Sequence, residues 1–263
     1  PLGTGVEGPG WSDAGGWNAS QYYTTIRLLD FDGDGKEDVC ARASGGIVCH
    51  RSTGTGFGPE IAGPAWSDAN GFASAKYYGT LRTGDVDGDG KDDLCVRDNQ
   101  GMICALSTGT GFGESIRGPA WSDQNGWGDQ QFFGSIRLAD VNGDGKADLC
   151  ARSSAELACH FSDGKTFGPA VTVAPLSNAT GWDDLGNLLT FRTGDVDRDG
   201  ASDLCLRAND RVSCWAYHGT AFEQIAGPAY SDENGWNAPQ HYETLRLGDL
   251  DGDGRFDVCA RSS

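Results

Sequence analysis

The sequence predicts an all-β fold: one domain, residues 1–263, forming a five-bladed β-propeller of four-stranded antiparallel blades. Three observations favour it. A nine-residue acidic loop starts at residues 30, 85, 140, 195 and 249, so the repeats are about 55 residues long. Each interval has room for four short β-prone segments, and none shows a 3.6-residue apolar period. Small sheets bury their faces by stacking around an axis. A linear solenoid, the alternative, needs polar capping repeats, but the end repeats resemble the others.

The second repeat illustrates the expected strands. Residues 77–84 are rich in aromatic and β-favouring residues and lead into the acidic loop, so they predict the first strand. Residues 94–97 and 102–106 predict antiparallel second and third strands around a turn. Residues 112–121 predict the fourth strand, and a polar connection then leads to the next repeat.

The acidic loop predicts one calcium site per repeat. It places oxygen-bearing side chains at positions 1, 3, 5 and 9, and the backbone carbonyl of position 7 can add another ligand. Ca²⁺ takes several oxygen ligands in a flexible shell, and these donors suit it better than Mg²⁺. The alternative is a polar turn capped by aspartates, which leaves four carboxylates repelling one another. The predicted ligands are Asp30, Asp32, Asp34, Lys36, Asp38, Asp85, Asp87, Asp89, Lys91, Asp93, Asp140, Asn142, Asp144, Lys146, Asp148, Asp195, Asp197, Asp199, Ala201, Asp203, Asp249, Asp251, Asp253, Arg255 and Asp257.

The third and fourth loops differ from the others. Asn142 keeps an oxygen but removes a charge, whereas Arg198 replaces the position-4 glycine and Ala201 replaces the basic residue of position 7. We expect the fourth site to bind calcium more weakly. Five divalent ions would change the formal charge from −18 to about −8 (−18 + 10), so the acidity mostly reflects metal binding. Without a basic stripe, nucleic acid is not an expected partner, and no apolar run is long enough for membrane insertion.

The cysteines predict disulfides. Four pairs have members nine residues apart and flank the turn between the second and third strands, and Cys259 stands alone. Cross-strand disulfides imply an oxidising, extracellular location, whereas reduced buried thiols are the alternative. Zinc knuckles of the C-x-x-C type are absent. The pairs are Cys40/Cys49, Cys95/Cys104, Cys150/Cys159 and Cys205/Cys214.

The two ends of the chain are expected to share the last blade. Aligning Trp11 with Trp66 places Leu2 and Val6 in a fourth strand, and residues 258–261 form a second strand. The joined blade would lack its third strand, where a partner for Cys259 would lie. The chain starts at Pro1 and shows no signal peptide, so it is expected to be a processed or excised piece. A fragment of a larger propeller, or an oligomer that supplies the missing strand, is the alternative.

The connection after each fourth strand predicts a carbohydrate site. Its aromatic rings can stack on the apolar face of a sugar while Asp and Asn bind hydroxyl groups. The alternative is structural: the rings wedge between blades and the polar groups cap turns. In the fourth repeat Leu176 and Asn178 replace the first aromatic and the Asp, so this site should be weakest. The candidate ligand-binding residues are Trp11, Asp13, Trp17, Trp66, Asp68, Asn70, Phe72, Trp121, Asp123, Asn125, Trp127, Tyr230, Asp232, Asn234 and Trp236.

Two arginines recur in each repeat and predict ion pairs with Asp or hydrogen bonds to backbone carbonyls. Catalysis is not expected, because no histidine lies in a nucleophile motif and most carboxylate pairs are assigned to metal. The arginines are Arg27, Arg82, Arg137, Arg192 and Arg246 before the acidic loops, and Arg42, Arg97, Arg152, Arg207 and Arg261 after the strand cysteines.

Phe57-Gly58, Gly63-Pro64-Ala65 and the acidic loop of residues 85–93 resemble the FG-GAP/VCBS-type β-propeller family. That family includes integrin α-subunit heads and a mushroom lectin that binds N-acetylglucosamine-type sugars. The resemblance implies calcium in the turn between the first and second strands, and a binding module rather than a catalyst. We therefore expect a calcium-stabilised lectin that binds glycans at several shallow sites, with affinity from multivalency. A protein-binding adhesion module, or the non-catalytic propeller of a larger secreted enzyme, is the alternative.

Overall fold

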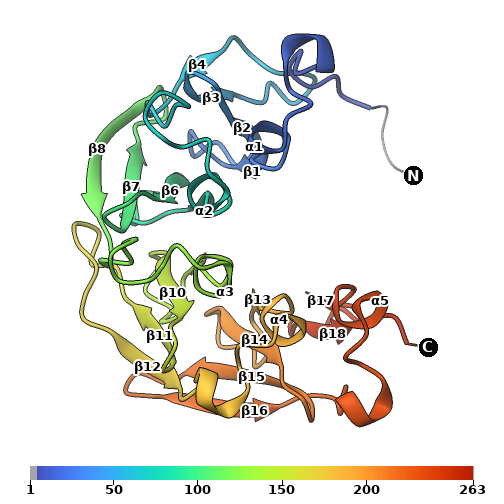
Figure 1. Cartoon of the computed structure of the whole chain (residues 1–263). Helices are drawn as coiled ribbons and strands as arrows, with labels where there is room; N and C mark the ends of the chain where they lie inside the picture. Colours follow the sequence, from blue (N-terminus) through green and yellow to red (C-terminus); the bar gives the residue numbers. More distant parts are fainter. Residues whose placement is uncertain (1–4, 263) are drawn as a thin grey trace. The chain divides into compact units, whose positions relative to one another are not determined.

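The computed structural model describes residues 5–262 (Figure 1). The first repeat comprises α1 (Ser20–Tyr23), β1 (Arg27–Leu29), β2 (Asp38–Ala43), β3 (Gly46–His50) and β4 (Ile61–Ala62). The second comprises α2 (Ala75–Tyr78), β5 (Arg82–Gly84), β6 (Asp93–Arg97), β7 (Met102–Ser107) and β8 (Phe112–Arg117). The third comprises α3 (Gln130–Phe133), β9 (Arg137–Ala139), β10 (Asp148–Arg152), β11 (Leu157–His160) and β12 (Val171–Ala174).

The remaining elements continue the same order. The fourth repeat comprises α4 (Leu185–Leu188), β13 (Arg192–Gly194), β14 (Asp203–Arg207), β15 (Val212–Tyr217) and β16 (Phe222–Ala226). The fifth contains α5 (Pro239–Tyr242), β17 (Arg246–Gly248) and β18 (Asp257–Cys259). Single 3₁₀ turns lie at Asp13–Gly15, Asn178–Thr180 and Asp232–Asn234.

The strands of each repeat form one antiparallel sheet in chain order. Residues 5–262 contain four four-stranded sheets, β1–β4, β5–β8, β9–β12 and β13–β16, and the two-stranded sheet β17–β18. Each first strand pairs with the second in the same register, with an arginine opposite the strand cysteine, as Arg82 lies opposite Cys95. The predicted four-stranded repeats of about 55 residues are thus confirmed for the first four repeats.

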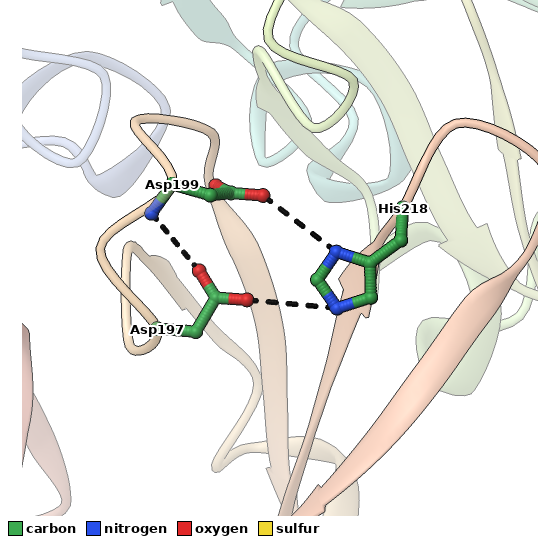
Figure 2. A group of neighbouring side chains, drawn as sticks. All are labelled: Asp197, Asp199 and His218. Atoms are coloured by element: carbon green, nitrogen blue, oxygen red, sulfur yellow. Dashed lines mark hydrogen bonds and ion pairs between the residues drawn. The ribbon is translucent and has the colours of Figure 1, made fainter.

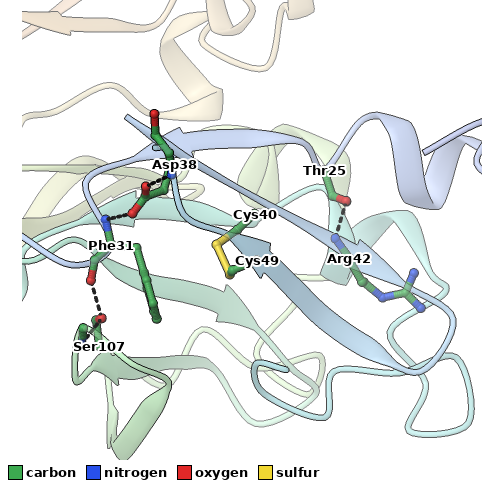
Figure 3. The surroundings of a disulfide bond; sticks show 9 residues. Thr25, Phe31, Asp38, Cys40, Arg42, Cys49 and Ser107 are labelled. Atoms are coloured by element: carbon green, nitrogen blue, oxygen red, sulfur yellow. Dashed lines mark hydrogen bonds between the residues drawn. A yellow bond between two sulfur atoms is a disulfide. The ribbon is translucent and has the colours of Figure 1, made fainter. Parts of the chain in front are cut away.

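Disulfides join the two middle strands of each four-stranded sheet, as predicted. They link Cys40–Cys49, Cys95–Cys104, Cys150–Cys159 and Cys205–Cys214, and the paired Cα atoms are 4.0–4.1 Å apart. The two cysteines of each pair lie directly opposite each other on neighbouring antiparallel strands, so their side chains meet on the same face of the sheet. Figure 3 shows the first of them. Within the described part of the chain, Cys259 is free and exposed.

The chain forms two compact units, one containing β1–β8 with Gly164–Thr166 and the other containing β9–β18. In the first unit, Leu29 and Phe31 from one repeat pack with Leu81 and Leu94 from the next. In the second unit, the sheets of consecutive repeats share apolar clusters in the same way. Each small sheet therefore buries a face against the neighbouring sheet of its unit.

The predicted first strand is wrong in its first half. Residues 77 and 78 end the one-turn helix α2, and the strand β5 begins only at Arg82. The reason lies in Thr80, whose N–H and hydroxyl both donate to Tyr77 O, at 2.9 and 2.7 Å. The same hydroxyl accepts a hydrogen bond of 2.8 Å from Arg97 N on β6. These hydrogen bonds hold Tyr77 and Tyr78 in a helical turn. The β-favouring side chains of this segment had instead predicted a strand.

The fourth strands are shorter than expected. β8 ends at Arg117, before the Gly118-Pro119 pair, and in the first repeat Phe57 forms only an isolated bridge with Ser52. No strand occurs between residues 5 and 26, so the expected strand at Val6 is not formed. Val6 is exposed, as expected of a segment that has no neighbouring third strand to pair with. Leu2, expected in the same strand, lies outside the described residues.

Within residues 5–262, no helix is both long and apolar enough to cross a bilayer.

Candidate metal centres and ligand pockets

The acidic loops bring the carboxylates of positions 1, 3 and 9 together. In each of four loops, one oxygen from each residue lies within 4.8 Å of the other two. These triads are Asp30/Asp32/Asp38, Asp85/Asp87/Asp93, Asp195/Asp197/Asp203 and Asp249/Asp251/Asp257. In the third loop Asn142 supplies an amide oxygen at position 3 between Asp140 and Asp148.

The loop backbone curls around the first aspartate. In the second repeat, Gly88 N and Gly90 N donate to the two carboxylate oxygens of Asp85, at 2.7 and 2.8 Å. Both glycines have positive φ, 78° and 85°, which side chains rarely tolerate. Arg198 adopts φ 72° at the equivalent of Gly88, so the fourth loop keeps this curl at a cost in backbone strain.

The last aspartate ties each loop to the rest of the sheet. Asp93 accepts hydrogen bonds from Val86 N, at 2.8 Å, and from Ser107 N at the end of β7, at 2.7 Å. Asp38 makes the equivalent contacts with Phe31 N and Ser52 N. Figure 3 shows Asp38 beside Phe31, whose carbonyl accepts from the Ser107 hydroxyl of the next repeat. A change in the loop is therefore transmitted to two sheets.

The electrostatics of the triads fit a bound cation. Burial, together with the carboxylates at positions 1 and 3, raises the pKa of Asp93 to about 7. Burial likewise raises the pKa values of Asp148 and Asp203 to about 7. Asp32 Oδ1 is buried and has no hydrogen-bond partner within residues 5–262. An all-oxygen donor set with unrelieved negative charge suits a hard divalent ion such as Ca²⁺.

The position-5 carboxylates lie outside these triads. Asp34, Asp89 and Asp144 each pair with the lysine of position 7, and the Asp144–Lys146 separation is 3.3 Å. The backbone N–H of position 7 also donates to the position-5 carboxylate, as Lys91 N does to Asp89 at 3.0 Å. In the fourth loop Ala201 removes the lysine, and Asp199 instead faces His218 (Figure 2). His218 is not among the site residues that the sequence predicts, although it stands at the position that Thr53 and Thr108 occupy in the first two repeats.

The aromatic residues of the connections pair with each other. Trp11 stacks on Trp17 with ring centroids 4.5 Å apart, and the pairs Trp121/Trp127 and Tyr230/Trp236 stack at 4.7 and 3.9 Å. Trp66 and Phe72 are tilted, with centroids 6.1 Å apart. The side chains of Trp66, Phe72, Trp121 and Trp127 are all buried. Much of this aromatic surface is therefore already used in packing.

The aspartates of these connections bind the buried arginines. Asp68, Asp123 and Asp232 form ion pairs with Arg42, Arg97 and Arg207, and Asn178 accepts from Arg152 at 2.7 Å. Figure 3 shows Arg42 on β2, with its N–H bonded to the Thr25 hydroxyl. The predicted pairing with Asp is confirmed for Arg42, Arg97 and Arg207. The first-strand Arg27 donates to backbone carbonyls as expected.

The asparagines have internal partners as well. Asn70 Nδ2 donates to Ala65 O at 2.7 Å, and Asn125 Nδ2 donates to Ala120 O at 2.9 Å. In the second and third connections, the first aromatic, the Asp and the Asn amide together hold the connection in place. What remains open to a ligand is the surface around the second aromatic ring.

Three equivalent cavities lie at that ring. Each is lined by the connection, by a residue of the following helix and by the turn between the second and third strands. One of about 200 Å³ is lined by Gly15, Gly16, Trp17, Tyr22, Ala43 and Ser44. A second of about 200 Å³ is lined by Asn70, Gly71, Phe72, Tyr77, Asp98 and Asn99. The third, of about 350 Å³, includes Trp182, Asn187, Asn209 and Asp210, in the repeat whose connection departs most from the motif.

Comparisons with known proteins agree with this architecture. The profile of the FG-GAP-like repeat matches residues 30–96, 85–151, 140–206 and 195–260, each match running from one acidic loop to the next. No curated protein matches the chain.

Among the solved structures that are similar in fold, two are informative. One is an Agrocybe aegerita lectin that specifically recognises non-reducing terminal N-acetylglucosamine, with 21% identity, a TM-score of 0.74 and 89% of this chain covered. This chain spans 60% of the lectin's length. The other is the Photorhabdus luminescens Tc holotoxin pore, with 19% identity, a TM-score of 0.57, and coverage of 89% of this chain and 10% of the toxin.

Proposed function

The chain belongs to the FG-GAP-like repeat family, and on this premise we propose that it is an extracellular, non-catalytic lectin. The five repeats form one five-bladed β-propeller, whose last blade contains β17 and β18. Each acidic loop holds one Ca²⁺, through the carboxylates of positions 1, 3 and 9 and the oxygens of positions 5 and 7. The disulfides support an oxidising, extracellular location.

The repeated cavity beside the second aromatic ring is the observation that carries the glycan proposal. Cavities of about 200 Å³ suit a single sugar unit better than an oligosaccharide. Trp17 offers partly exposed ring surface and the buried Phe72 lines its cavity, while Ser44 and Asn99 offer polar groups for sugar hydroxyls. The similar lectin, which recognises a terminal sugar, supports the same ligand class.

Within each connection the roles are divided. Trp17 and Phe72, and by equivalence Trp127 and Trp236, contact the sugar. The first aromatic, the Asp and the Asn position that ring through their internal contacts. Trp182 extends the set to the fourth repeat, where Asn178 in place of Asp still binds the buried arginine. Calcium acts indirectly: it stabilises the loop between the first and second strands of each sheet, and these sheets carry the connections.

A glycan array with calcium present tests the proposal. We expect binding to glycans with a common terminal sugar, and loss of most of that binding in the triple variant Trp17→Ala/Phe72→Ala/Trp182→Ala. Several weak sites act together on a surface, so losing three lowers apparent affinity by about 10²-fold or more.

Leu28→Ala is the matched control, because Leu28 is an exposed apolar residue outside the cavities and its loss should leave binding unchanged. Melting curves establish that each variant is folded. An array without bound glycans, or a folded triple variant that binds like the parent, contradicts the lectin assignment.

A further inference from the structure

The fourth acidic loop has a different set of metal-ligating groups from the first two. His218 follows β15 at the position of Thr53 and Thr108, and its backbone N–H bonds to Ala221 O as Thr108 N bonds to Gly111 O. Ala201 stands where the other loops have Lys36 or Lys91, so no lysine covers Asp199 from position 7. The imidazole occupies the space beside Asp197 and Asp199 (Figure 2).

The imidazole lies between the two carboxylates, with one ring nitrogen facing each, and the three side chains are close enough to bind one metal ion after rotation. His218 Nε2 lies 3.7 Å from Asp197 Oδ2, and Nδ1 lies 3.9 Å from Asp199 Oδ2. Both separations are too long for a hydrogen bond. Two ligands bound tetrahedrally to Zn²⁺ at about 2.0–2.1 Å lie about 3.4 Å apart. One imidazole nitrogen and one oxygen of each carboxylate already lie within 4.8 Å of one another.

The loop backbone orients both carboxylates. Asp199 N donates to Asp197 Oδ1 at 3.1 Å, and Ala201 N donates to Asp199 Oδ1 at 2.8 Å. These bonds direct the Oδ2 atoms toward the imidazole, as Figure 2 shows for the three residues. The His218 side chain is 43% exposed, so it can rotate to present either ring nitrogen and leave room for water ligands.

We propose that Asp197, Asp199 and His218 form a binding site for a divalent transition-metal ion, Zn²⁺, adjacent to the fourth calcium triad. Imidazole is a good ligand for Zn²⁺, whereas Ca²⁺ prefers oxygen ligands. His218 therefore makes this group of side chains favour Zn²⁺ over Ca²⁺. Asp197 belongs to both the calcium triad and this group, and Asp199 is shared with the proposed calcium ligands as their position-5 residue. Three protein ligands leave the fourth position to water, as in open zinc sites.

Zinc titration of the calcium-saturated full chain, followed by calorimetry, tests the site. We expect one Zn²⁺ per chain, and an affinity at least about tenfold lower in His218→Thr, which introduces the residue of the first two repeats. Ala201→Lys should also weaken zinc binding, because the new lysine can reach Asp199 as Lys91 reaches Asp89. Co²⁺ bound in place of zinc should give a visible absorption band that His218→Thr removes.

The second repeat provides the matched control. Lys91→Ala alone should bind no additional zinc, whereas Lys91→Ala/Thr108→His should gain a second site. The site does not depend on glycan binding, so its failure and that of the lectin proposal are separable. Absence of a zinc site in the parent chain, or equal zinc affinity in folded His218→Thr, would overturn the assignment.

Discussion

Removal of calcium is expected to lower the melting temperature by more than ~10 °C. A site occupied at about a hundred times its dissociation constant contributes about 2.7 kcal/mol, and 1 kcal/mol shifts the melting temperature of a chain of this size by about 2–4 °C. Each loop is tied to its own sheet, as Asp93 is to Ser107, and Phe31 O ties the first loop to the next repeat. Losing several ions should therefore loosen several sheets at once.

The loss should depend on pH in a defined direction. In calcium-free protein the pKa values of Asp93, Asp148 and Asp203 are about 7, well above the unfolded value of 3.8. Between these values the folded state binds more protons than the unfolded state, so stability falls as pH rises. Calcium-free protein should thus melt at a lower temperature at pH 8 than at pH 5, and excess calcium should restore most of the difference.

Calorimetric melts of chelator-treated protein, dialysed to remove chelator and metal, measure both effects. Magnesium at equal concentration is the control and should restore less stability than calcium. Identical melting curves with and without calcium at pH 8 would be incompatible with metal in the loops.

Arg97→Ala is expected to destabilise the protein by about 2–3 kcal/mol, because it leaves acceptors of a buried, charged donor unsatisfied. The Arg97 side chain is fully buried, its Nε donates to Trp121 O at 2.7 Å, and its guanidinium pairs with Asp123. The alanine variant leaves that carbonyl and one oxygen of Asp123 without their donors. The other oxygen of Asp123 keeps its ion pair with Lys76 Nζ and its hydrogen bond of 2.6 Å from Tyr77 OH. The expected loss therefore comes mainly from the Trp121 carbonyl and from the oxygen of Asp123 that Arg97 contacted.

Denaturant unfolding in calcium measures the change. Arg211→Ala is the matched control, because Arg211 is exposed and its partner Asp210 is largely exposed, so the loss should stay below about 1 kcal/mol. Equal stability of the two variants would mean that the buried arginines do not anchor the connections.

Much of the fold follows from local sequence patterns. The spacing of the acidic loops and of the short β-prone segments predicted the four-stranded repeats, and the cysteine spacing predicted the disulfides. These features could be predicted because each involves residues that are close together in the sequence. The one-turn helices were not predicted, because Thr80 holds Tyr77 in a helical turn through a contact with Arg97 on another strand. Strand and helix propensities of single residues cannot predict a hydrogen bond between two distant segments.

The candidate sites were predictable to different degrees. The metal triads were visible because positions 1, 3 and 9 lie within nine residues. The partner of Arg97 was not identified, since Asp123 is 26 residues away and was considered a sugar ligand. The cavities depend on three separate segments meeting, as Phe72, Tyr77 and Asn99 do, and no single motif encodes that meeting.

The calcium content of the chain at equilibrium with free calcium tests whether the acidic loops bind this ion. We expect about five bound ions per chain, one per acidic loop and weakest in the fourth, and one fewer in Asp85→Ala/Asp87→Ala. A folded protein that retains no calcium above the buffer level, or a double variant that retains as much as the parent, would contradict the account.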